Sequence, residues 1–123
     1  MWRLLAEAEL VIASDLTFVE CRRALVRAEA LGARIGGETG WYTAKLAATA
    51  ESWTRVAVDQ LTLDRAGRRF PVEPVRTLDA IHLASALIAR EAVSDLILLS
   101  LNGRVRANAS ALGFPLLPDP SLP

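Results

Sequence analysis

Short runs of apolar residues interrupt longer segments in which polar and apolar positions follow a helical spacing. A short continuous apolar run is typical of a strand buried on both faces of a parallel sheet. Two runs are clear, Leu10–Ala13 and Leu96–Leu99. A weaker strand is expected at Val56–Val58, and a last short strand at Phe114–Leu117. The pattern therefore predicts strands spread along the whole chain.

The segments between these runs carry the helical spacing. The strongest helix is predicted from Leu78 to about Ala92, with Thr77 as its N-cap. Its buried face is expected to hold Ile81, Ala84, Ser85 and Ile88. Further helices are expected at residues 2–9, 39–52, 62–69 and 104–112, the last one ended by Gly113.

The first clear strand leads directly into a helix. Ser14 is a plausible N-cap, and Asp15 follows in the first turn, where a carboxylate favours the helix dipole. The apolar positions of this helix are Phe18, Cys21, Leu25 and Ala28, and it is expected to end near Gly32. The glycines from Gly32 to Gly40 predict a loop. Because this loop follows a helix and not a strand, a phosphate-binding role is disfavoured.

Strands that alternate with helices of ten or more residues predict an α/β fold with a parallel sheet. A chain of 123 residues is long enough for one core and short enough for one domain. We expect that domain to span residues 1–117, with a proline-rich tail at residues 118–123.

Composition removes several classes of protein. A hydrophobic content of 52% rules out disorder, and no apolar stretch approaches the roughly 18 residues of a membrane span. One cysteine and one histidine exclude a disulfide framework and the usual zinc sites. With 14 basic and 14 acidic residues, bulk charge would not hold the chain to nucleic acid. No signal peptide is visible, so a cytoplasmic location is expected.

Acidic and amide side chains follow the strands at the edge where parallel α/β sheets place their sites. Glu20 lies on the helix after the first strand, between its apolar stripe and solvent, and Asn102 follows the strand at 96–99. Asp79 lies in the first turn of the 78–92 helix, where an acid is commonly a capping device. A half-buried carboxylate at a sheet edge, such as Glu20, suits a divalent metal ion.

Several segments resemble PIN-domain proteins, specifically the VapC-type toxins of type II toxin–antitoxin systems. Ala13–Leu25 is similar to the family's second-acid segment, and Thr77–Ala84 is similar to its third-acid segment. Leu98–Val105 resembles the strand and acid near the family's C-terminus, and Ala111–Leu116 also fits. The similarity runs from about residue 4 to residue 117, in the family's order and spacing.

The resemblance implies a PIN-like three-layer α/β/α fold and a metal-dependent endoribonuclease that uses Mg²⁺ or Mn²⁺. It implies Glu20 and Asp79 as catalytic acids, and Glu20, Asp79 and Asn102 as metal ligands. The implied partners are an RNA substrate, a cognate antitoxin and a second copy of the chain. Arginines beside the acids are candidate contacts to RNA phosphates, although solvated arginines are as common. These are Arg22, Arg23, Arg76 and Arg104.

Two departures from the family pattern lower the expected activity. The family's first acid lies on a first, central strand, and we expect that strand to be absent from this sequence. Asn102 stands where the family usually has Asp, and an amide brings no charge to a metal ion. We therefore expect weak metal binding and slow or absent cleavage.

Two other functions remain open. One is a non-catalytic PIN-domain remnant that serves as an antitoxin-binding or dimerisation module. The other is an unrelated α/β ligand-binding domain, which the lack of a phosphate loop after a strand disfavours. His82 is expected to pack its helix more often than act as a general base, and Trp2, Trp41 and Trp53 are expected in the core or a dimer contact.

Overall fold

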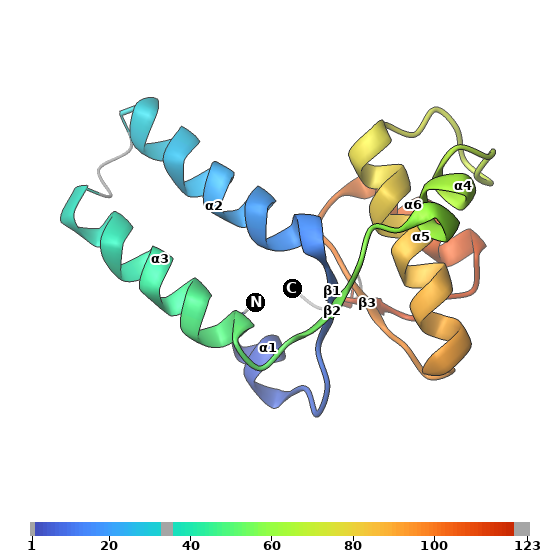
Figure 1. The fold of residues 1–123 in the computed structure, drawn as a ribbon, viewed down its shortest axis with the longest axis horizontal. Helices are drawn as coiled ribbons and strands as arrows, with labels where there is room; N and C mark the ends of the chain where they lie inside the picture. Colours follow the sequence, from blue (N-terminus) through green and yellow to red (C-terminus); the bar gives the residue numbers. More distant parts are fainter. Residues whose placement is uncertain (1, 33–35, 120–123) are drawn as a thin grey trace. The chain divides into compact units, whose positions relative to one another are not determined.

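The computed structural model describes residues 2–32 and 36–119, and it has an α/β fold with short parallel strands (Figure 1). The helices are α1 (Trp2–Glu7), α2 (Asp15–Ala30), α3 (Gly36–Ala50), α4 (Gln60–Ala66), α5 (Thr77–Ala92) and α6 (Gly103–Ala111). The strands are β1 (Ile12–Ser14), β2 (Thr54–Val56), β3 (Leu98–Leu99) and β4 (Leu116–Leu117). The α/β class predicted from the sequence is confirmed.

The chain divides into two compact units. The N-terminal unit is Trp2–Ala57, and the C-terminal unit begins at Val58 and is described to residue 119. Each unit holds its own two-stranded parallel sheet, β1 with β2 and β3 with β4. The sequence predicted one parallel sheet, so the described residues differ in having two. A single domain over residues 1–117, followed by a tail, stays a prediction.

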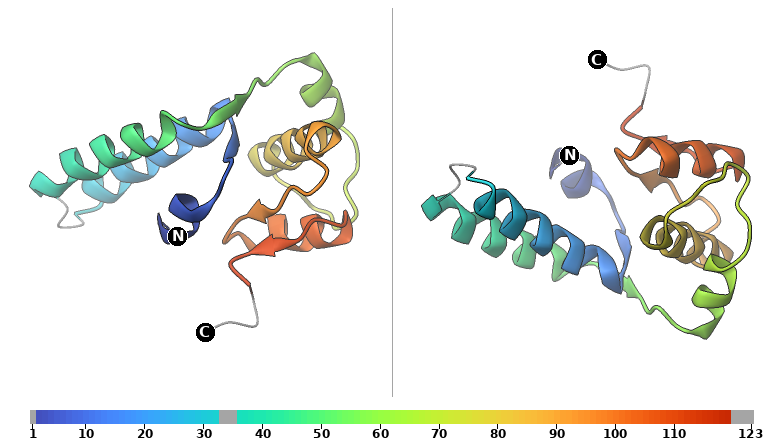
Figure 2. Two further views of the ribbon diagram at one scale, coloured as in Figure 1. Left: turned by 90° about the horizontal axis from the view of Figure 1, so that it is seen from below. Right: turned by 90° about the horizontal axis from the view of Figure 1, so that it is seen from above.

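In the N-terminal unit, α2 and α3 lie side by side as a helical hairpin (Figure 2). The adjoining sheet pairs Ile12 with Thr54 and Ser14 with Val56. The strand was expected over Leu10–Ala13 and buried on both faces. The strand begins at Ile12, because β2 supplies only three partner residues. Leu10 precedes the strand and is exposed. Both expectations are therefore wrong for Leu10.

Helix α2 begins and ends close to where the sequence predicts. Ser14 has the extended backbone of an N-cap, but its side chain makes no capping hydrogen bond. Its Oγ lies 3.3 Å from the Oγ1 of Thr17 instead. At the other end Gly32 has a φ of +83°, the left-handed conformation that glycine adopts without strain. The predicted N-cap residue and the predicted end of the helix are thus confirmed, although the Ser14 side chain makes no capping hydrogen bond.

The second helix of the hairpin starts earlier than expected. Gly36, Gly37 and Gly40 lie within α3, so the loop predicted up to Gly40 is wrong at these positions, while residues 33–35 lie outside the described residues. Glycine disfavours a helix only by about 1 kcal/mol per residue, which pairing with α2 can offset. The buried apolar residues of α3 are Leu46 and Ala50.

In the C-terminal unit, α4 packs on α5, and α6 contacts both α5 and β4. Asp59 caps α4, because its carboxylate accepts hydrogen bonds from the backbone N–H and the hydroxyl of Thr62, each at 3.0 Å. Thr77 is the first residue of α5, and Arg76 occupies the N-cap position without a side-chain bond. The prediction of Thr77 as the cap is therefore wrong by one residue.

The core of this unit gathers apolar side chains from α5, α6 and the loops beside them. Its buried members are Phe70, Ala80, Leu83, Val105, Ala109 and Phe114. Leu98 and Leu116 pack against them from the sheet. On α5 the predicted burial of Ile81, Ala84 and Ser85 is confirmed. Ile88 is only half-buried, since the core side of the helix runs through Ala80 and Leu83.

Within residues 2–32 and 36–119, no helix combines the length and the apolar character that a membrane span requires.

Candidate functional site

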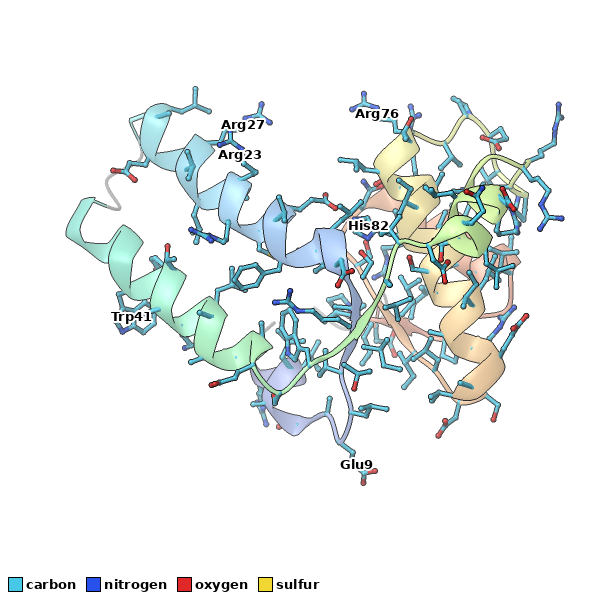
Figure 3. All side chains as sticks on the ribbon, in the orientation of Figure 1. Glu9, Arg23, Arg27, Trp41, Arg76 and His82 are labelled. Atoms are coloured by element: carbon cyan, nitrogen blue, oxygen red, sulfur yellow. The ribbon has the colours of Figure 1, made fainter. Side chains whose placement is uncertain are left out.

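The first turn of α5 carries Asp79, the acid of the Thr77–Ala84 segment. Asp79 is half-buried, in the turn where a carboxylate interacts favourably with the helix dipole. Arg76 precedes the helix and is exposed; Figure 3 shows it at the start of α5. An acid and an arginine therefore lie within one helical turn of each other.

The start of α6 carries Asn102, just after the carboxyl end of β3. Asn102 is the N-cap of α6, and its Oδ1 accepts the backbone N–H of Arg104 at 2.9 Å and of Val105 at 3.2 Å. Its own N–H donates to Oγ of Ser100 at 3.1 Å. The oxygen that would bind a metal ion is thus already the acceptor of two hydrogen bonds. The structure assigns this side chain a capping contact, and its role as a metal ligand stays a prediction.

Arg104 connects the two helix starts. Its Nη1 donates to the carbonyl oxygen of Pro74 at 3.2 Å, two residues before Arg76. The segment that leads into α5 is therefore held beside the first turn of α6. Arg76 and Asp79 lie at the start of α5, and Asn102 and Arg104 lie at the start of α6; we call these four residues the helix-start site.

Two residues of this region were missed by the sequence analysis. Asn108 is buried on α6 and its side chain bonds the backbone of Val72. Arg106 donates to the carbonyls of Ser100, Leu117 and Pro118 at 2.6, 3.1 and 2.7 Å, which ties the carboxyl ends of β3 and β4 together. A signal for Asn108 was present, because it shares a helix face with Val105, Ala109 and Leu112 and is the polar member of that apolar stripe.

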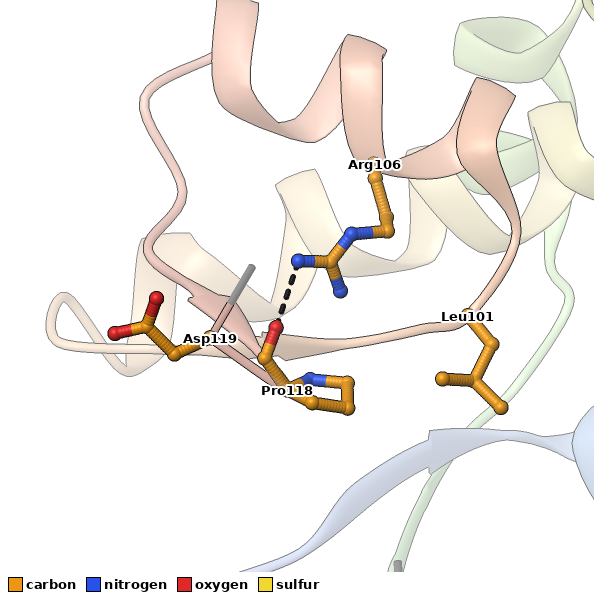
Figure 4. A pocket seen from close by; sticks show the side chains of 4 residues that line it. All are labelled: Leu101, Arg106, Pro118 and Asp119. Atoms are coloured by element: carbon orange, nitrogen blue, oxygen red, sulfur yellow. Dashed lines mark hydrogen bonds between the residues drawn. The ribbon is translucent and has the colours of Figure 1, made fainter. Parts of the chain in front are cut away.

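Beside Arg106 the surface forms a shallow pocket of about 220 Å³, lined by Leu101, Arg106, Pro118 and Asp119 (Figure 4). Figure 4 also shows the guanidinium of Arg106 on the Pro118 carbonyl. A larger depression of about 390 Å³ lies along α4 and α5, where charged side chains of both signs flank Leu87 and Ile88. Both are open to solvent, unlike the enclosed cavity typical of a small-molecule site.

The second predicted acid, Glu20, lies on α2 in the N-terminal unit. It is half-buried, as expected from its place between the apolar stripe and solvent. Burial raises the pKa of the neighbouring Cys21 thiol, and the negative charge of Glu20 raises that pKa further. Cys21 is therefore kept as a neutral thiol at pH 7, which disfavours a nucleophilic role for it.

The arginines of α2 are exposed. Arg22 lies over the ring of Phe18, with its Cζ 5.8 Å from the ring centre, and Arg55 approaches the same ring at 5.0 Å. In Figure 3, Arg23 and Arg27 point away from α2 on the side opposite α3. The three arginines of α2 are therefore accessible to a phosphate backbone, and contact of Arg22 and Arg23 with RNA stays a prediction.

The remaining aromatic and histidine predictions have different outcomes. Trp41 is 56% exposed on α3, which is not a core position within this chain, and Lys45 lies 4.9 Å from the centre of its ring. Trp53 and His82 are half-buried, and Trp2 lies at a position whose burial is not described. A dimer contact through Trp41 stays a prediction.

The donor chemistry of the predicted metal site fits Mg²⁺ in part. Glu20 and Asp79 offer carboxylate oxygens, the hard ligands that Mg²⁺ and Mn²⁺ prefer. Asn102 fits less well, because its amide oxygen serves the helix cap. Within the described ranges of the chain, no cluster of three or more His, Cys, Asp or Glu side chains is present. Glu20 belongs to the N-terminal unit, whereas Asp79 and Asn102 belong to the C-terminal unit.

Comparison of the chain with protein-family models, with curated proteins and with solved structures gave no match.

Proposed function

We propose that the chain is a PIN-like, VapC-type endoribonuclease that acts in the cytoplasm and hydrolyses RNA phosphodiester bonds with Mg²⁺ or Mn²⁺. The proposal starts from the similarity of Ala13–Leu25 and Thr77–Ala84 to the acid segments of that family. One observation supports it above the others. Asp79 and Arg76 lie at the start of α5, and Arg104 binds the segment that leads into that helix. An acid for a metal ion and cations for a phosphate thus occur together.

In this function the carboxylate of Asp79 would bind a divalent ion, and the family resemblance implies the carboxylate of Glu20 as a further ligand. When bound, the ion would supply Lewis-acid polarisation of the scissile phosphate and a lowered pKa of water. The guanidinium groups of Arg76 and Arg104 would bind the phosphates that flank the cleaved bond. Arg104 keeps N–H donors beyond the one bond to Pro74, since a guanidinium has five. Asn102 would hold the start of α6 in place through its cap.

The proposed partners are the RNA substrate, a cognate antitoxin and a second copy of the chain. Exposed apolar side chains on the helical hairpin are surface that a protein partner would cover. They are Val19 and Val26 on α2 and Trp41 on α3.

A non-catalytic PIN remnant that binds an antitoxin or forms a dimer is the second candidate. The capping bonds of Asn102 favour it, because they engage the amide oxygen that a metal ion would need. Asp at this position would cap α6 equally well and add a negative charge. The substitution Asn102→Asp therefore separates the two functions without removing the cap.

The deciding experiment is cleavage of a fluorogenic RNA by four proteins, each with Mg²⁺ and with EDTA. They are the unsubstituted chain, Asn102→Asp, Asn102→Asp/Asp79→Asn and Asn102→Asp/Asp95→Asn. We expect slow or undetectable cleavage by the first and a Mg²⁺-dependent gain in the second, because the substitution restores the acid at one of the two positions where this sequence departs from the family pattern. Asp79→Asn should abolish that cleavage, whereas Asp95→Asn, which changes an exposed acid outside the site, should leave it within about twofold.

Two results would reject the nuclease. One is an Asn102→Asp protein that cleaves none of the RNAs tried. The other is cleavage that survives Asp79→Asn, which would indicate a contaminating enzyme. In either case concentration-dependent sedimentation of the unsubstituted chain tests the dimerisation module that then takes its place.

A further inference from the structure

A fully buried amide on α6 holds a loop that is distant in the sequence. Asn108 has 0% of its surface exposed. Its Oδ1 accepts the backbone N–H of Val72 at 2.8 Å, and its Nδ2 donates to the carbonyl of the same residue at 2.9 Å. The Nδ2 also donates to the carbonyl of Arg104 at 3.1 Å. One side chain thus pairs with both polar groups of Val72 as a neighbouring strand would.

The loop that Asn108 holds is the approach to α5. It runs from Phe70, which is buried in the core, to Arg76. The N–H of Phe70 donates to the carboxylate of Glu73 at 2.9 Å, which tightens the first half of the loop. The second half is bound by Arg104 through the carbonyl of Pro74.

The two ties come from one face of α6. Arg104 and Asn108 are four residues apart, so they lie one above the other along the helix. Both bind the 70–76 loop, Asn108 at Val72 and Arg104 at Pro74. The loop is therefore fixed to α6 at two points before α5 begins at Thr77.

We infer that Asn108 is a positioning residue for the helix-start site. By fixing the loop before α5, it sets where Asp79 and Arg76 lie relative to Asn102 and Arg104. The inference rests on the proposed function for its catalytic consequence, but the clamp itself does not depend on that function. An amide suits this position, because the Val72 backbone presents one donor and one acceptor and the amide meets them with separate oxygen and nitrogen atoms.

The first test measures amide hydrogen exchange in the unsubstituted chain and in Asn108→Ala. In the unsubstituted chain we expect the Val72 amide to be protected, although it lies in a bend outside any helix or strand. In Asn108→Ala its exchange should accelerate at least about tenfold, the factor expected for loss of one buried hydrogen bond. The amide of Ala80, which makes the first hydrogen bond of α5 to the carbonyl of Arg76, should accelerate with it. An unprotected Val72 amide in the unsubstituted chain would overturn the inference even if the variant fails to fold.

The second test compares RNA cleavage in the Asn102→Asp background, with Ser85→Ala as the matched control. Ser85 is also buried and its hydroxyl donates to the Ile81 carbonyl at 2.8 Å, within α5 and without any bond to the loop. Both variants lose a buried polar side chain, and urea unfolding measures how much stability each loses. We expect Asn108→Ala to lower kcat/KM at least about tenfold and Ser85→Ala to change it less than about twofold.

The outcomes separate the two proposals. An Asn102→Asp protein that cleaves no RNA rejects the nuclease, and hydrogen exchange still decides whether Asn108 clamps the loop. If cleavage is present but Asn108→Ala and Ser85→Ala reduce it equally, Asn108 acts only on stability and the positioning role is rejected. Unchanged exchange at Val72 and at Ala80 in Asn108→Ala rejects it as well.

Discussion

The two units of this chain are built from similar elements but bury their apolar side chains very differently. Each has helices beside a two-stranded parallel sheet. In the C-terminal unit, α5 alone contributes Ala80, Ile81, Leu83, Ala84 and Ala89 as buried apolar residues. In the N-terminal unit the sixteen residues of α2 include none that is buried. The same alternation of strand and helix therefore yields a dense core in one unit and a thin one in the other.

The difference in apolar burial between the two units indicates which residues of the proposed site lie on rigid elements. Asp79, Arg76, Asn102 and Arg104 belong to the unit with the dense core, where side-chain bonds also tie the loops. Glu20 lies on α2, a helix that relies on half-buried contacts such as those of Phe18 and Leu25. We expect the N-terminal unit to open more readily, because local stability follows buried apolar contacts. The proposed protein partners would act mainly on this unit.

The largest expected effect comes from a matched pair of leucine truncations. Leu83→Ala removes a side chain with 0% exposure and should lower the free energy of unfolding of the C-terminal unit by about 3 kcal/mol. Leu25→Ala, on half-buried α2, should cost only about 1 kcal/mol. Urea denaturation followed by circular dichroism gives both values, and hydrogen exchange of α2 and α5 assigns each loss to its unit. Equal losses of stability in the two variants would contradict the expected difference in packing between the two units.

A smaller effect is expected at the two glycines with positive φ. Gly113 follows α6 at a φ of +89°, so Gly113→Ala should destabilise the C-terminal unit by about 1 kcal/mol. Gly32 follows α2 at +83°, and Gly32→Ala should strain only the end of the N-terminal hairpin. Thermal unfolding of the C-terminal unit should therefore respond to the first substitution and not to the second.

The control for these glycines is Gly67→Ala. Gly67 ends α4 at a φ of −77°, a conformation that alanine adopts freely, and the nearest atoms to an added Cβ lie at 3.6 Å or more. A loss at Gly67 equal to that at Gly113 would show that the positive φ is not the cause.

The smallest expected effect is a dependence of stability on acid pH in the C-terminal unit. The backbone N–H of Thr62, and then its hydroxyl, hold the pKa of the Asp59 carboxyl below its ordinary value of 3.8. The folded state therefore favours the charged carboxylate. Its contribution is complete above pH 3.8 and is lost as the pH falls through the lowered pKa. An NMR titration of the Asp59 carboxyl should give that lowered pKa.

Asp59→Asn keeps an oxygen for the cap and should remove this part of the pH dependence. Helix α2 provides the contrast, because its N-cap Ser14 has no group that titrates in acid. An unchanged acid transition in Asp59→Asn would show that other carboxyls account for it.

The order and type of the elements followed from the sequence because they depend on local periodicity. The helix at 78–92 is correct within one residue, since its apolar spacing and the acid in its first turn agree. The helix after Ser14 and its end near Gly32 are also correct. Strand ends were less accurate, because a strand exists only where a partner pairs with it, and β3 and β4 pair over two residues only.

The candidate acids were also visible in the sequence, since Asp79 and Glu20 lie in segments with a specific pattern and fall on helices as expected. What those side chains touch was decided only by tertiary structure. Asn102 is the cap of α6, Arg104 binds Pro74, and Asn108 pairs with Val72 across 36 positions of the chain. Local pattern carries no information about such pairs, because each bond depends on how α6 packs beside the loop that begins α5. The sequence by itself thus indicated which residues are candidates for the chemistry, and packing determined which side chains of the C-terminal unit are held to which loops.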